Sequence, residues 1–183
     1  MDTTLNIAVL VGSIRQDALN KKLAAGLARL APPGFVLEQI RIDDLPLYNQ
    51  DDDAHPSAPV QRLRSQIAAA NGVLFVTPEY NRSVPGVLKN AIDHASRPYG
   101  QSVWSGKPGA VLGISVGSMG TSMAQQHLRN ILAYLDVPTL GQPEVYLHYR
   151  DEFFTPEGDI GEASRTFLQD WMDRYVAWVK QHA

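Results

Sequence analysis

Two polar segments, each following a short apolar run, contain residue types that could bind an anion and a flat ring. The first segment runs from Gly12 to Asn20 and reads GSIRQDALN. The hydroxyl of Ser13 and the amide of Asn20 can donate hydrogen bonds, and the guanidinium of Arg15 can pair with phosphate oxygens. A helix that begins here would add unpaired backbone N–H groups, which favour an anion.

This segment differs from the common nucleotide-binding motifs. Gly12 is its single glycine, whereas G-x-G-x-x-G and Walker A loops need at least two. A single terminal phosphate therefore fits better than a dinucleotide. A second interpretation of the same residues is a polar helix start, with Asn20 as the N-cap and Arg15 in solvent.

The second segment, residues 77–86, reads TPEYNRSVPG. Its two prolines restrict the backbone and can hold N–H groups against a planar heterocycle, on which Tyr80 could stack. The alternative is a proline-rich turn with a buried tyrosine.

Short apolar runs alternate with helical patterns along the whole chain. The runs that predict strands are 5–11, 35–42, 72–76 and 110–114, with a fifth near 138–140 or 145–147. The segments that predict helices are 20–30, 60–70, 85–96, 119–135 and 161–181. This alternation predicts one α/β domain over residues 1–183, a doubly wound five-stranded parallel sheet. Its strand order is either the flavodoxin-like 2-1-3-4-5 or that of a small Rossmann variant.

In the flavodoxin-like order, ligands bind beyond the carboxyl ends of strands 1 and 3. The two polar segments follow these two strands, so we expect them to form one site for a phosphate and a planar ring.

Composition narrows the chemistry further. The chain has no cysteine, which excludes disulfides, iron–sulfur clusters and thiolate zinc sites, so redox chemistry would need a bound cofactor. A net charge of −3 with scattered Lys and Arg argues against nucleic acid as a partner. We see no signal peptide and no stretch long enough to span a membrane, and we therefore expect a cytoplasmic protein.

Several longer motifs carry a resemblance to a known family. They are GSIR at 12–15 with Asn20, PEYN at 78–81, PGVLKNAIDHASRP at 85–98, GKP at 106–108, GSMG at 117–120 and AQQHLR at 124–129. In these motifs, from Leu5 to about Leu147, the chain resembles the NAD(P)H-dependent FMN reductases, which include bacterial chromate and quinone reductases and azoreductase-like enzymes. PEYN followed by PGxLKNAID is the most specific part.

The resemblance implies a flavodoxin-like fold, order 2-1-3-4-5, with bound FMN. It implies that the FMN phosphate is held by Ser13, Arg15, Leu19 and Asn20. It implies that the isoalloxazine lies against Pro78, Glu79, Tyr80 and Asn81, with its pyrimidine edge near Ser115, Gly117 and Ser118. Ala18 stands where relatives commonly carry serine, which implies one phosphate hydrogen bond fewer, or a bridging water.

The implied reaction passes hydride from NADPH or NADH through FMN to a small-molecule acceptor, by a ping-pong mechanism. Quinones, azo compounds, nitro compounds and metal oxyanions are the implied acceptors. The flavin carries the chemistry, so no catalytic side chain and no metal ligand is expected. The resemblance also implies a homodimer or homotetramer.

Two other functions compete with this one. Residues 113–117 read GISVG and match G-x-S-x-G, which would make Ser115 the nucleophile of a serine hydrolase. Its partners in chain order would be Asp136 or Asp159 and His148 or His182. The other function is that of a flavodoxin-like electron carrier without catalytic turnover.

Overall fold

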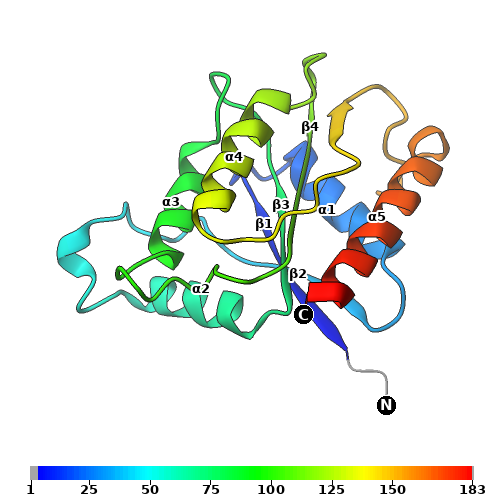
Figure 1. Ribbon diagram of the computed structural model, residues 1–183. Helices are drawn as coiled ribbons and strands as arrows, with labels where there is room; N and C mark the ends of the chain where they lie inside the picture. The colour runs from blue at the N-terminus through cyan, green and yellow to red at the C-terminus, as the bar shows by residue number, and fades with distance from the viewer. Residues whose placement is uncertain (1–3, 183) are drawn as a thin grey trace.

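Five parallel strands form one sheet in the computed structural model, which describes residues 4–182 (Figure 1). The strands are β1 (Leu5–Val11), β2 (Phe35–Gln39), β3 (Gly72–Val76), β4 (Gly109–Ser115) and β5 (Val145–His148). Their order is β2-β1-β3-β4-β5, and every pair is parallel. The expected flavodoxin-like fold is confirmed, and the Rossmann alternative is wrong.

The central strands are apolar throughout because both of their faces are covered. Every residue of β3 is buried, as are the last five residues of β1. In the register, Val76 is level with both Val11 and Leu112. The carboxyl ends of β1, β3 and β4 therefore meet at one edge of the sheet, the upper edge in Figure 1.

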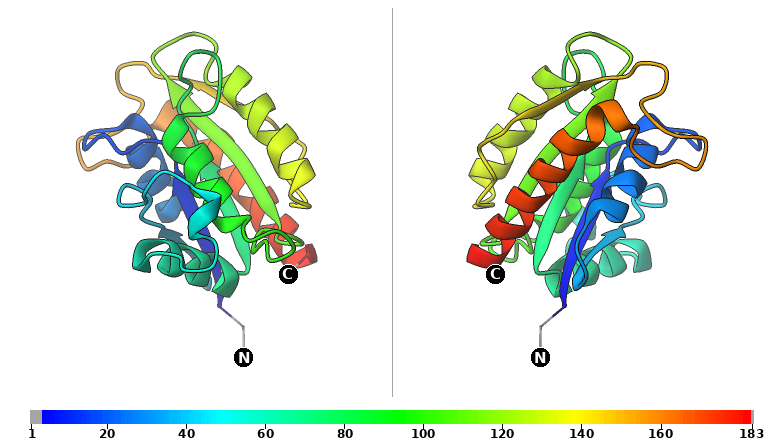
Figure 2. Two further views of the ribbon diagram at one scale, coloured as in Figure 1. Left: turned by 90° about the vertical axis from the view of Figure 1, so that its left-hand side faces the viewer. Right: turned by 90° about the vertical axis from the view of Figure 1, so that its right-hand side faces the viewer.

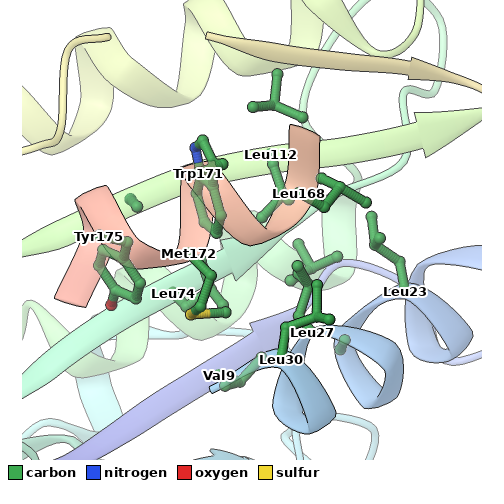
Figure 3. Close-up of a cluster of buried hydrophobic side chains, with 14 of the residues drawn as sticks. Val9, Leu23, Leu27, Leu30, Leu74, Leu112, Leu168, Trp171, Met172 and Tyr175 are labelled. Atoms are coloured by element: carbon green, nitrogen blue, oxygen red, sulfur yellow. The ribbon is translucent and has the colours of Figure 1, made fainter. Parts of the chain in front are cut away.

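The described chain also contains five α-helices and one short 3-10 helix, of which the last in the chain follows the final strand and the others lie between strands. They are α1 (Leu19–Leu30), η1 (Gln50–Asp52), α2 (Ala58–Ala69), α3 (Gly86–Ala95), α4 (Ser122–Tyr134) and α5 (Glu162–His182). Figure 2 shows α2, α3 and α4 covering one face of the sheet, while α1 and α5 cover the other. Beneath α1 and α5, leucines of α1 pack against Leu168, Trp171 and Met172 of α5 (Figure 3).

Most boundaries lie within two residues of the sequence prediction, and three differences are structurally informative. β2 ends at Gln39 instead of residue 42, although Ile40 still donates its N–H to the carbonyl of Val9 at 2.9 Å. The fifth strand is 145–148, whereas the segment near 138–140 makes only an isolated bridge to β4. Helix α4 begins at Ser122 instead of 119, because Gly120 and Thr121 have φ values of 56° and 71°, which no α-helix accommodates. Within residues 4–182, no helix is both long and apolar enough to cross a membrane.

Candidate functional site

Three loops meet where β1, β3 and β4 end: residues 12–18, 77–85 and 116–121. Glycines allow these loops to pack against one another. A Cβ atom on Gly12 would lie only 3.0 Å from the hydroxyl of Thr77, and one on Gly113 would clash with the backbone carbonyl of Thr77. Any side chain at position 113 would therefore displace the loop after β3.

The first loop presents a row of free backbone donors. In the part of the chain that the structure describes, the N–H groups of residues 13–20 have no hydrogen-bond acceptor, and the first bond of α1 runs from Lys21 N to the carbonyl of Ala18. Ser13 is 6% exposed, and its hydroxyl has no partner among residues 4–182. Arg15 is exposed and donates from Nη2 to the carbonyl of Asp17 at 2.8 Å. Such a concentration of donors at a helix N-terminus suits a phosphate group.

Asn20 does not cap α1, so that interpretation of the sequence was wrong. The N-cap is Ala18, and Asn20 lies in the first turn with a side chain that is 3% exposed. Its Nδ2 donates to the carbonyl of Ile114 at 2.9 Å, and its Oδ1 accepts from the N–H of Ile114 at 3.0 Å. The amide of Asn20 thus makes the two bonds that a residue of a neighbouring strand would make with the backbone of Ile114, just beyond the end of β3. These bonds fix the start of α1 to β4.

The second loop contains a tight two-residue turn. Tyr80 and Ser83 exchange two backbone hydrogen bonds, of 3.1 and 3.0 Å, around Asn81 and Arg82. These two residues have φ values of 52° and 61°, the signature of a type I′ turn. Tyr80 is 52% exposed, so the alternative of a buried tyrosine was wrong.

The second loop is also bound to α4. The carboxylate of Glu79 accepts hydrogen bonds from the N–H groups of Met123 and Ala124, and the hydroxyl of Ser83 lies 2.9 Å from Nδ1 of His127. Sequence reasoning missed both connections, because residues 44 positions apart show no periodic relationship in one sequence.

The third loop leaves its apolar side chains open. Val116 and Met119 are exposed, and the hydroxyl of Ser115 accepts a hydrogen bond from the N–H of Gly117 at 3.0 Å. Gly117 and Ser118 are exposed as well. Ile14 and Tyr80 are exposed as well, so each of the three loops carries an exposed apolar or aromatic side chain.

A serine-hydrolase triad is not assembled around Ser115. Nε2 of His148 lies 3.1 Å from the carbonyl of Val116, and His182 contacts the carbonyl of Trp178. The two candidate acids are elsewhere: Asp136 accepts from Ser105 and Asp159 pairs with Arg29. The hydrolase alternative is therefore wrong, since a base must reach the nucleophile.

One further cavity, of about 270 Å³, lies between η1, α2 and the end of α3. Tyr48, Arg64 and His94 line it, and none of its lining residues belongs to the three loops. Asp51 and Asp52 lie in η1 and are exposed, while Asp53 accepts a hydrogen bond from the hydroxyl of Tyr48. Among the described residues, no group of three His, Asp or Glu side chains is arranged to hold a metal ion.

Comparisons with known proteins agree with this geometry. A 2-hydroxy-1,4-benzoquinone reductase of a Burkholderia species is 53% identical over 177 residues, which cover 96% of this chain and 97% of that protein. A quinone reductase of Pseudomonas putida is 48% identical over 181 residues, 98% of this chain and 97% of that protein. The structure of FerB, a flavoenzyme NAD(P)H:(acceptor) oxidoreductase from Paracoccus denitrificans, superposes with a TM-score of 0.93 at 42% identity and covers 97% of this chain and 98% of that one.

The family model for NADPH-dependent FMN reductases matches residues 5–152. This segment contains all five strands and all three loops of the site. The competing function, an electron carrier without turnover, is not supported by these relatives, since those named above are reductases or oxidoreductases. The chain is thus an oxidoreductase that belongs to the NADPH-dependent FMN reductase family, with FMN as cofactor and NAD(P)H as electron donor.

Proposed function

We propose that this protein reduces quinones with electrons from NADPH or NADH, using FMN bound at the three loops. The observation that carries the proposal is the row of backbone N–H groups at residues 13–20 without acceptors, together with the exposed apolar or aromatic side chains of the three loops. A phosphate end and a flat apolar end match the two parts of FMN. The two relatives with the identities given above are named as quinone reductases, which supports this acceptor class.

The phosphate of FMN would be held by the first loop. Ser13 offers its free hydroxyl, Arg15 its guanidinium, and Leu19 and Asn20 their backbone N–H groups at the positive end of α1. The side chain of Asn20 is bound to Ile114, so we assign it the task of holding this row of donors in place. Ala18 has no hydroxyl to add, and backbone donors therefore carry most of the recognition.

The isoalloxazine would lie between the second and third loops. Pro78, Glu79, Tyr80 and Asn81 would line one side through the rigid backbone of the turn, and Ser115, Gly117 and Ser118 would face the pyrimidine edge. The side chain of Glu79 points to α4, so its contribution to the ring would come from its backbone. The exposed ring of Tyr80 would cover an edge of the flavin.

When bound, FMN would supply the redox chemistry between the nicotinamide and the acceptor. The protein's own residues bind and orient the reactants, and no side chain acts as a nucleophile or a general base. Donor and acceptor would both use the open surface beside Tyr80 and Met119, so each must leave before the other binds. We therefore expect ping-pong kinetics, and an open surface also suits azo compounds, nitro compounds and metal oxyanions.

We further propose that residues 1–183 form a single FMN-binding domain that works in the cytoplasm as a homodimer or homotetramer. Its partners would be the nicotinamide donor and a small-molecule acceptor. The net charge of −3 supports the proposal that nucleic acid is not a ligand.

The test is a visible absorption spectrum of the purified protein, before and after anaerobic addition of NADPH. We expect flavin bands that bleach on addition and return when a benzoquinone is supplied. Bands that do not bleach would refute electron transfer from NADPH. A colourless protein that takes up no added FMN would refute the proposed site.

A further inference from the structure

Helix α4 begins without a cap from its own segment. Its N-cap residue, Thr121, has a left-handed backbone and makes no side-chain capping bond. The free N–H groups of a first helical turn need an acceptor. Glu79, from the loop after β3, provides it: Oε2 accepts from Met123 N at 3.0 Å and from Ala124 N at 3.1 Å. One loop of the site therefore caps the helix that follows another.

A second bond holds the same loop one turn further along α4, where the hydroxyl of Ser83 lies 2.9 Å from Nδ1 of His127. Residues 123, 124 and 127 share one face of the helix. The type I′ turn at Asn81 and Arg82 lies between the two attachments. The turn, the third loop and the start of α4 are thus joined into one unit.

The carboxylate of Glu79 also places a negative charge at the start of α4. The N-terminus of a helix carries partial positive charge, and a carboxylate there offsets it. Both loops that would line the isoalloxazine meet at this helix end. A negative charge nearby opposes the negative charge that the ring gains on reduction, so the carboxylate would lower the reduction potential of bound flavin.

We propose that Glu79 is a positioning residue: it holds the two ring-lining loops at a fixed separation, and its charge keeps the flavin potential low. The second effect rests on the proposed FMN site, whereas the first is a property of the protein alone.

Three variants separate geometry from charge. Glu79→Gln keeps an oxygen that can accept both N–H groups but removes the charge. Glu79→Ala removes both. Glu157→Gln is the matched control, because Glu157 is exposed and makes no side-chain hydrogen bond within residues 4–182.

The first measurement is amide hydrogen exchange at Met123 and Ala124 in FMN-free protein. We expect exchange on the order of tenfold faster in Glu79→Ala, and within about twofold of wild type in Glu79→Gln and Glu157→Gln. The dissociation constant of FMN should rise on the order of tenfold in Glu79→Ala, because its loops are no longer held together. Unchanged exchange and unchanged FMN affinity in Glu79→Ala would overturn the positioning role.

The second measurement is the flavin reduction potential of the loaded protein. In Glu79→Gln we expect a higher potential than in wild type, equivalent to reduced FMN binding about two- to fivefold more tightly relative to oxidised FMN. Glu157→Gln should match wild type. A Glu79→Gln potential equal to that of wild type would overturn the charge effect. If wild-type protein takes up no FMN, the proposed function fails, while the exchange experiment still decides the positioning role.

Discussion

Replacing Asn20 by alanine tests how the start of α1 is held against β4. The variant removes both hydrogen bonds to Ile114 and leaves a buried N–H and a buried carbonyl without partners. Each buried group left unpaired costs about 1–3 kcal/mol. We therefore expect Asn20→Ala to lower the free energy of unfolding by roughly 2–6 kcal/mol, a large fraction of the total for a domain of this size.

The matched control lies at the opposite end of the sheet. Oδ1 of Asn71 accepts from the N–H of Asn6 at 2.9 Å, but this bond is single and exposed. Asn71→Ala should therefore cost only about 0.5–1 kcal/mol. The assay is equilibrium unfolding in urea of FMN-free protein, so that loss of cofactor does not contribute. If Asn20→Ala is no less stable than Asn71→Ala, the side chain of Asn20 does not carry the connection to β4, and our account of the first loop is refuted.

Three other perturbations address the site and the core. Arg15→Ala should raise the dissociation constant of FMN about tenfold in fluorescence titrations, since it loses a charge-assisted bond; unchanged affinity would count against the phosphate assignment. Ser115→Ala should leave quinone reduction largely intact in steady-state assays, because the flavin carries the chemistry. Complete loss of activity would show that the Ser115 hydroxyl is essential and would contradict this expectation. Tyr175→Phe removes the bond from the buried phenol to the carbonyl of Val73 at 2.8 Å and should cost about 1–2 kcal/mol in urea unfolding at pH 7. Burial raises the pKa of Tyr175 well above its ordinary value near 10, so the folded state holds this proton more strongly than the unfolded state. The stability of the wild type should therefore fall more steeply than that of Tyr175→Phe as the pH rises above about 10, and an equal pH dependence of the two proteins in this range would refute the assignment.

The sequence predicted the strands well because buried strands of a parallel sheet consist of continuous apolar runs. β1 and β3 have the boundaries that their composition indicated, and the alternation of strands and helices predicted a doubly wound parallel sheet. The alternation left two strand orders open, and the family resemblance implied the one that the structure shows. The proposed place of the site follows from that order, since two unusual loops follow β1 and β3.

What the sequence did not predict depends on contacts between distant residues. Asparagine is a residue type that often caps helices, yet the side-chain amide of Asn20 pairs with a strand residue 94 positions away. Glu79 belongs to the motif that we propose lines the flavin ring, yet its carboxylate caps α4. In both cases the local pattern indicates which element the residue lies in or beside, while its partner depends on how distant segments pack together. The later start of α4 has the same origin, because Gly120 turns sharply against the backbone of Tyr146.

The free N–H groups of residues 13–20 have a consequence for how this protein tolerates mutation. Donors in the main chain are the same for almost every amino acid, so an exposed position such as Gln16 can change its side chain without removing a donor of the proposed phosphate site. Proline is the exception, because it has no N–H to offer. The residues that resist change are those that shape the loop from beneath, Gly12 and Asn20. Amino-acid variation should therefore be broad at the exposed positions of this loop and narrow at Gly12 and Asn20.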